Sequence, residues 1–156
     1  MRISLLSVGR RMPAWVVQGF GEYAKRLPKE CDLRLVEIEP VARTKGGDRM
    51  RAISLEGERI LQAVPKGAWV VALDVGGPSW STEALALELK HWMASGQDVA
   101  LLVGGADGLS SACLARADAR WSLSPLTFPH PLVRVILAEQ LYRAWTLLQG
   151  HPYHRG

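Results

Sequence analysis

The chain contains 156 residues, 48% of them hydrophobic and 22% charged, and its formal net charge is +4 at pH 7. This length suits one ordinary domain, so we expect a single domain over residues 1–156. No apolar stretch approaches the about 20 residues of a membrane-spanning helix, and the N-terminal apolar run is too short for a signal peptide, which excludes a membrane protein and predicts a cytoplasmic one.

Short apolar runs alternate with helix-period segments along the whole chain. Strand-like runs rich in Val, Leu or Ile occupy residues 3–8, 33–39, 69–75, 98–105 and 120–124. Helix-period segments occupy residues 13–27, 48–64, 81–96 and 131–150. This alternation predicts an α/β domain whose mostly parallel sheet is covered by helices on both faces.

The ends of the helical segments carry start and stop signals. Pro13 suits a first helical position, Asp48 and Ser81 are suitable N-caps, and Gly96 favours a helix end. Residues 40–48, between the second strand and the second helix, form a basic, glycine-containing loop.

The final helical segment, from Pro131 to Gly150, is apolar over more than the stripe of about 100° that a surface helix buries. One explanation is that this helix is buried more deeply than usual in its own domain. The other, which we expect, is a homodimer that forms through the C-terminal helix.

The positive charge is concentrated in the first third of the chain. Residues 1–51 hold 11 Lys and Arg against 6 Asp and Glu, whereas residues 52–156 hold 8 against 9. Such clustering fits a nucleic-acid surface and also fits ordinary solvated helix faces. Charge alone does not distinguish these two explanations.

The two cysteines, Cys31 and Cys113, lie far apart and have no partner at metal-ligand spacing. We expect inert, buried thiols rather than a disulfide or a zinc site. Serine-protease order, the His-Glu-x-x-His pattern and paired carboxylates are all absent from the sequence, which disfavours hydrolases and metalloenzymes. We therefore predict no bound metal.

Three loops have unusual sequences and follow strands, where ligands bind in parallel α/β domains. The first is ALDVGGPSWS (residues 72–81) and the second is LLVGGADGLS (101–110), whose glycines allow sharp turns and close approach to a ligand. The third, SLSPLTFPHP (122–131), is stiffened by three prolines and suits the wall of a site for a flat ligand. By itself the Gly-Gly-x-x-Gly pattern is weak, because plain turns also use it.

The last six residues, HPYHRG, place His151, Tyr153, His154 and Arg155 within five positions. Chain ends usually fray, so this tail is either a polar leftover or a set of functional groups. A proline between the histidines argues against a helical metal pair. We expect no helix or strand to include the last four residues.

The three segments LLVGGADGLS, SLSPLTFPHPLVRVILAEQLYRAW and HPYHRG together resemble the SPOUT superfamily of knotted methyltransferases, and specifically the ribosomal RNA large subunit methyltransferase H family. The resemblance extends over the whole chain, including MPAWVVQGFGEYAKRLP and LDVGGPSWST. Two departures are GGADG, where the family favours GGPEG, and the terminal Gly156, where an acidic residue is common.

The resemblance implies a SPOUT-type α/β fold with a C-terminal trefoil knot, in place of the open sheet that periodicity alone suggests. It implies a homodimer that uses S-adenosylmethionine to methylate N3 of a pseudouridine in the helix 69 loop of 23S rRNA on assembled ribosomes. The cofactor contacts carried over by motif are Leu73, Gly104, Gly105, Leu123, Ser124, Pro125, Leu126, Thr127 and Phe128.

Within this resemblance, the tail residues become the catalytic candidates. The imide N3 of pseudouridine is a weak acid, so a base or a cation near it would help. His154 would act as base or hydrogen-bond partner, Arg155 would hold phosphate or an anionic base edge, and Tyr153 would stack on or bond to the nucleotide. His130, between two prolines, is expected to shape the cofactor loop.

Two other functions remain open at this point. A non-catalytic RNA-binding module would account for the basic first third and the six tryptophans. A nucleotide- or flavin-binding α/β protein would account for the glycine loop. Affinity for S-adenosylmethionine separates the first from the methyltransferase, and a bound chromophore or nucleotide would indicate the second.

Overall fold

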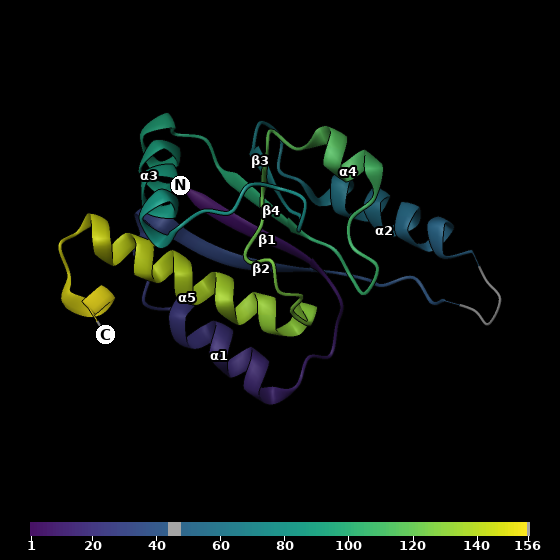
Figure 1. The fold of residues 1–156 in the computed structure, drawn as a ribbon, viewed down its shortest axis with the longest axis horizontal. Helices are drawn as coiled ribbons and strands as arrows, with labels where there is room; N and C mark the ends of the chain where they lie inside the picture. The colour runs from purple at the N-terminus through teal and green to yellow at the C-terminus, as the bar shows by residue number, and fades with distance from the viewer. Residues whose placement is uncertain (44–47, 156) are drawn as a thin grey trace.

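Five parallel strands form the central sheet of the computed structural model, which describes residues 1–43 and 48–155 (Figure 1). The strand order is β2-β1-β4-β3-β5, and each neighbouring pair is parallel. The strands are β1 (Arg2–Val8), β2 (Asp32–Ile38), β3 (Trp69–Leu73), β4 (Val99–Val103) and β5 (Ala119–Trp121). The predicted parallel sheet is confirmed. Residues 44–47 of the basic loop and the terminal Gly156 lie outside the described residues.

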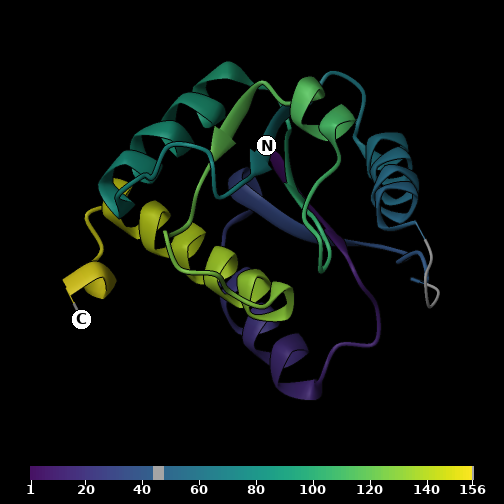
Figure 2. The ribbon, with the colours of Figure 1, turned by 45° about the vertical axis from the view of Figure 1, so that its right-hand side comes forward.

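Helices cover both faces of this sheet, as the alternating sequence predicted. One face carries α1 (Ala14–Ala24), α3 (Thr82–Ser95) and α5 (His130–Leu148), and the other carries α2 (Arg49–Ala63) and α4 (Ser111–Arg116) (Figures 1 and 2). Two 3-10 turns, η1 (Lys29–Cys31) and η2 (Pro152–Arg155), complete the described elements. No residue range was predicted for α4, because only six residues form it.

Most of the predicted helix caps are found in the structure. The Asp48 carboxylate accepts a hydrogen bond from the backbone N–H of Arg51 at 3.2 Å, and the Ser81 hydroxyl accepts one from Ala84 at 3.0 Å. Gly96 ends α3 with a φ of 73°, a left-handed conformation that glycine adopts without strain. Pro13 is the N-cap itself, one residue before its predicted position.

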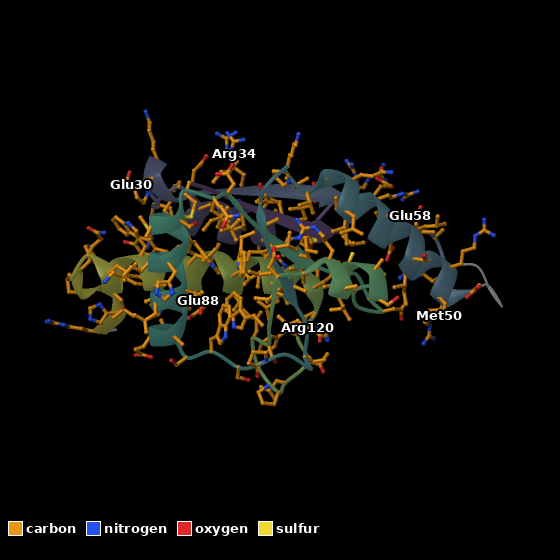
Figure 3. The ribbon with its side chains drawn as sticks, turned by 90° about the horizontal axis from the view of Figure 1, so that it is seen from above. Glu30, Arg34, Met50, Glu58, Glu88 and Arg120 are labelled. Carbon is orange, nitrogen blue, oxygen red and sulfur yellow. The ribbon has the colours of Figure 1, made fainter. Side chains whose placement is uncertain are left out.

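Alternation along the strands divides the core into two layers. In β1, Ile3 and Leu5 pack toward α3 and α5, whereas Leu6 and Val8 belong to the cluster that includes α2. All four side chains are buried. Charged residues such as Glu30, Arg34 and Glu58 project outward from the edges of the molecule (Figure 3).

Helix α5 uses most of its apolar surface inside its own chain. It packs against both α1 and α3 on one face of the sheet. Its buried apolar residues are Val133, Leu137, Ala138, Leu141, Tyr142 and Ala144. Deep burial in its own domain, the first of the two explanations, therefore accounts for much of the apolar stripe, and a homodimer through this helix stays a prediction.

Both cysteines are free, buried thiols, as predicted. Burial raises the pKa of the Cys31 thiol to about 12 and raises that of Cys113 as well, so neither is a thiolate at neutral pH.

Among the described residues, no helix is long and apolar enough to cross a membrane. The threading of the C-terminal segment into a trefoil knot also stays a prediction.

Candidate active site

A cavity of about 510 Å³ opens beyond the carboxyl ends of three neighbouring strands. Leu73 ends β3, Val103 ends β4 and Trp121 ends β5, and all three line the cavity. Pockets for small ligands usually measure about 300–1,000 Å³. The cavity lies where parallel sheets generally bind ligands, and its size suits a molecule of nucleoside dimensions.

The three unusual loops meet at this cavity. Of the nine predicted cofactor residues, eight line it and Pro125 does not. Those that line it are Leu73, Gly104, Gly105, Leu123, Ser124, Leu126, Thr127 and Phe128. The structure therefore brings together residues that are up to 55 positions apart in the sequence.

Ten further residues line the cavity, and of these only Trp121 and Val133 lie outside the three loops singled out in the sequence. The ten are Asp74, Val75, Val103, Ala106, Gly108, Leu109, Trp121, Pro129 and Val133, together with His130, which was expected only to shape the loop. Val103 and Trp121 lie within the predicted strand runs 98–105 and 120–124, and the carboxyl end of a parallel strand is the signal that could have found them. Val133 offers no such signal, since it lies within a helix.

The first loop is fixed against strand β5. The backbone N–H of Asp74 donates to the carbonyl of Trp121 at 3.0 Å, and the N–H of Ser122 donates to the carbonyl of Pro78 at 2.9 Å. The Trp80 ring stacks on Trp121 with centroids 4.9 Å apart. Gly77 approaches so closely that a Cβ there would lie 3.0 Å from the Trp121 nitrogen. This side of the cavity is therefore rigid.

The glycine loop forms a tight turn in which its glycines are needed for internal packing. The N–H of Gly108 donates to the carbonyl of Gly105 at 3.1 Å, and Gly108 has a φ of +83°. A Cβ at Gly104 would lie 2.4 Å from the carbonyl carbon of Gly108, which is a severe clash between backbone segments. The turn, rather than the approach of a ligand, is thus what first requires glycine at 104.

The proline-rich loop is held by its serines. The Ser124 hydroxyl accepts a hydrogen bond from the N–H of Leu126 at 2.9 Å, and the Ser122 hydroxyl donates to the Ser124 carbonyl at 3.2 Å. Leu126 remains 68% exposed at the cavity, and Phe128 is half-buried in its wall. This loop presents apolar side chains and fixed backbone groups to the cavity.

The walls suit a largely apolar, flat ligand with a few polar groups. Two buried ring nitrogens among the lining residues, Nε1 of Trp121 and Nδ1 of His130, have no hydrogen-bond partner within the described structure. Burial, and then the charge of Arg134, lower the pKa of His130, so its imidazole is neutral near pH 7. The cavity can thus supply neutral hydrogen-bonding groups in addition to its backbone.

The C-terminal tail is ordered on helix α5. Gly150 has a φ of +69°, and the N–H of His151 donates to the Thr146 carbonyl at 2.9 Å, which turns the chain back. The prediction that no helix includes residues 153–156 is wrong for 153–155, which lie in η2. Pro152 can begin this 3-10 turn, because the first N–H groups of a helical turn have no partner within the turn and proline lacks only such a group.

Tyr153 anchors this tail. Its hydroxyl donates to the Glu139 carboxylate at 3.2 Å, its ring meets the Tyr142 ring edge-on at 4.7 Å, and the Arg143 guanidinium lies 4.9 Å above it. Burial, together with neighbouring groups that include Glu139, raises the pKa of Tyr153 to about 12. The phenol therefore stays neutral and acts as a donor at physiological pH.

The other tail residues make fewer contacts than Tyr153. His154 is half-buried, and its Nδ1 has no partner within the described part of the chain, whereas Arg155 is exposed. Among the described residues, no group of three or more His, Cys, Asp or Glu side chains could hold a metal ion.

The tail lies far from the cavity of its own chain. His130, at the start of α5, lines the cavity, and the tail follows the other end of this 19-residue helix (Figure 1). At 1.5 Å per residue the helix is about 28 Å long, and the Tyr153 hydroxyl, which reaches back to Glu139, lies about 14 Å along it from His130. None of Tyr153, His154 and Arg155 lines the cavity, so one chain does not bring the predicted catalytic and cofactor residues together.

Arg134 and Arg143, the two arginines of α5, have structural partners. Arg134 is 1% exposed and donates to Glu37 at 2.9 Å, to the Gly9 carbonyl at 2.9 Å and to the Ser7 hydroxyl at 3.2 Å. It thereby ties the start of α5 to the ends of β1 and β2. Arg143 pairs with Glu139 at 2.7 Å beside the tail.

Comparison with known proteins gives consistent matches over nearly the whole chain. A family profile described as "Predicted SPOUT methyltransferase" matches residues 1–154. The Ribosomal RNA large subunit methyltransferase H of Hahella chejuensis is 61% identical over 155 residues, and the protein of the same name from Thioalkalivibrio sulfidiphilus is 63% identical over 155. Each alignment covers 99% of both chains.

Solved structures agree at the level of the fold. A methylase family protein from Neisseria gonorrhoeae superposes with a TM-score of 0.55 and 12% identity, covering 90% of this chain and 80% of that one. One from Haemophilus influenzae Rd KW20 superposes with a TM-score of 0.54 and 12% identity, covering 97% and 69% respectively.

Proposed function

The chain belongs to the ribosomal RNA large subunit methyltransferase H family of SPOUT methyltransferases, and from this we propose that it methylates N3 of a pseudouridine in the helix 69 loop of 23S rRNA. The observation that carries this proposal is the cavity at the ends of β3, β4 and β5, which collects eight of the nine residues assigned to the cofactor by family motif. The same proposal places the protein in the cytoplasm, where ribosomes are assembled.

The cavity fits S-adenosylmethionine in size and in the groups that it offers. When bound, this cofactor supplies an activated methyl group. The backbone of the glycine turn and of residues 123–128 would bind its polar parts, while Leu73 and Phe128 would contact the adenine. The unpartnered nitrogens of Trp121 and His130 are further groups that this ligand could satisfy.

The tail supplies the groups suited to the acceptor base. The imide proton of a pseudouridine must leave N3 during transfer, and a positioned base or cation lowers the barrier. Because the pKa of Tyr153 is raised to about 12, this residue cannot serve as the base and is assigned to stacking and hydrogen bonding. His154 remains as the candidate base, and the exposed Arg155 as the cation.

The separation of tail and cavity favours a site shared between two chains. A two-fold axis perpendicular to α5 would pair the two helices antiparallel, so that the end of one α5 lies beside the beginning of the other. In that arrangement the tail of each protomer reaches the cavity of its partner. We therefore propose that the tail of one protomer and the cavity of the other form one active site.

Helix α1 provides exposed apolar surface for such a dimer beside α5. Trp15 is 56% exposed and Val17 is 62% exposed, and α1 packs directly on α5. Exposed apolar side chains mark protein–protein contacts where they form a continuous patch with their neighbours. The proposed interface therefore combines α1 with the outer edge of α5, rather than α5 alone.

Light scattering at micromolar concentration is expected to return twice the 17.1 kDa mass of one chain. Replacing Trp15 by Glu should weaken the dimer, because a carboxylate would be buried without a partner. Leu87→Glu, at a 59% exposed position on α3, is the matched control and should leave the mass unchanged. A monomeric wild-type protein would contradict the proposal.

Mass mapping of 23S rRNA from a deletion strain, with and without this protein restored, tests the reaction and its position. We expect the methyl group on the helix 69 pseudouridine to disappear and return. The net charge of +4 offers few phosphate contacts, so intact ribosomes should be methylated much faster than isolated 23S rRNA. If the chain bound RNA but not S-adenosylmethionine, a non-catalytic RNA-binding module would replace this proposal.

A further inference from the structure

A buried carboxylate lies behind the glycine turn of the cavity. Glu56, on helix α2, is only 2% exposed, and a buried charge is costly unless it is paired and hydrogen-bonded. It accepts a hydrogen bond from the backbone N–H of Val41 at 2.9 Å and pairs with both terminal nitrogens of Arg43, Nη2 at 3.1 Å. Glu56 thus holds the segment that follows β2 against α2.

The same arginine also contacts the glycine turn. Nε of Arg43 donates to the Asp107 carboxylate at 3.0 Å, and Nη1 donates to the Val41 carbonyl at 2.7 Å. Asp107 lies between Ala106 and Gly108, both of which line the cavity. One guanidinium therefore joins a carboxylate on α2 to a carboxylate in the wall of the cavity.

Neighbouring contacts close this cluster from two further sides. A Cβ on Gly105 would lie 3.6 Å from Oε1 of Glu56, so the turn and the buried carboxylate are nearly in contact. Arg49, at the start of α2, lies 3.6 Å from the other oxygen of Asp107 but is 74% exposed and weakly held. The position of Asp107 therefore depends chiefly on Arg43.

The geometry points to Arg43 as a positioning residue that fixes the glycine turn in its cofactor-binding shape by bridging Glu56 and Asp107. This assignment rests on the proposed function, since it concerns the same cavity. Arg43 belongs to the basic first third of the chain, yet its N–H groups are used by protein oxygens. It acts on cofactor affinity through the turn and is not an RNA contact.

Arginine is required here because two carboxylates must be bound at once. Its planar fork presents five donors in fixed directions, whereas lysine is a single point charge on a flexible stem. Arg43→Lys keeps the charge and can pair with Glu56, but it cannot also hold Asp107. Asp107→Asn removes the charge on the other side of the bridge and changes little in size.

The test measures binding of S-adenosylhomocysteine by calorimetry, together with steady-state kinetics on ribosomes. We expect Arg43→Lys and Asp107→Asn each to raise Kd about tenfold, the effect of losing one hydrogen bond between charged groups. KM for S-adenosylmethionine should rise similarly, while kcat at saturating cofactor stays within about twofold of the wild type. Amide hydrogen exchange should become faster at residues 104–109 and remain unchanged in α5.

Arg10→Lys is the matched control, because Arg10 pairs with Glu39 at 2.6 Å on the surface, with both side chains more than half exposed. Its Kd should equal that of the wild type. Unchanged Kd in Asp107→Asn, or an equal loss in Arg10→Lys, would overturn the assignment, even if Arg43→Lys failed to fold. If the wild-type protein does not bind S-adenosylhomocysteine, the proposed function itself fails.

Discussion

Removal of residues 153–156 is expected to abolish methyl transfer and to leave the affinity for S-adenosylmethionine close to that of the full chain. The truncation removes the candidate base and cation, and positioned acid–base groups typically contribute about 10²–10⁴-fold to a rate. The tail is assigned to the acceptor base, and the residues assigned to the cofactor all lie outside it, so we expect the affinity to be kept. Tritium transfer to purified ribosomes and calorimetry on the same sample give the two values.

The truncation also removes the contacts of Tyr153 with Glu139 and Tyr142, so a milder variant is needed beside it. His154→Ala leaves these contacts in place and should lose most of the activity. Tyr153→Phe keeps the ring packing and loses one hydrogen bond, so it should retain dimer formation. Near-normal transfer by the truncated enzyme would show that the tail is not catalytic.

A mixed dimer can establish which cavity each tail serves. One inactive chain lacks residues 153–156 but has an intact cavity, and the other carries Gly104→Val, is assayed at a cofactor concentration below its Kd, and has an intact tail. If tails act in the partner's cavity, each mixed dimer has one complete site, and random pairing restores about a quarter of the wild-type activity. If tails act within their own chain, co-expression restores nothing.

Gly104→Ala is expected to weaken S-adenosylmethionine binding strongly. Even a methyl group at this position would lie 2.4 Å from the Gly108 carbonyl carbon and 2.7 Å from the Leu109 nitrogen, so the turn must open. Overpacking costs about 1–3 kcal/mol. If this cost destabilises the cofactor-bound state, it corresponds to about a 5- to 150-fold loss of affinity. Gly104→Val should have a larger effect in the same direction.

Calorimetry on folded protein measures this effect, and a second glycine provides the control. Gly21 lies in helix α1, and a Cβ there would meet nothing within 4 Å. Gly21→Ala should leave affinity unchanged and slightly raise the stability of the protein, because alanine is the better helix former. An affinity for Gly104→Ala equal to that of the wild type would mean that the turn does not bind the cofactor.

The parallel sheet and the meeting of three loops could be predicted because local patterns encode them. Buried strands have apolar runs, and the loops that follow parallel strands lie at one edge of the sheet, while the family resemblance assigned Leu73 and Gly104 to one cofactor pocket. The family resemblance added the assignment of residues 123–128 to the cofactor. These inferences need only the order of elements and the identity of residues next to each strand.

The cluster of Arg43, Glu56 and Asp107 could not be predicted in this way. Its members are 13 and 64 positions from Arg43 and come from a loop, a helix and a turn. Each looks like an ordinary surface charge in the sequence, and only the packing of α2 against the glycine turn buries Glu56. The position of the tail, by contrast, was missed because sequence shows which groups it carries but not how far α5 removes them from the cavity.

The length of helix α5 sets the distance between the cavity at its start and the C-terminal tail at its end. Its first residue lines the cavity and its last turn carries the tail, with 19 residues of continuous helix between them. One residue added to or removed from its middle would shift the tail by about 1.5 Å and rotate it by about 100° around the helix axis. Tyr153, His154 and Arg155 would then face a different direction, so the length of this helix is part of the active-site design.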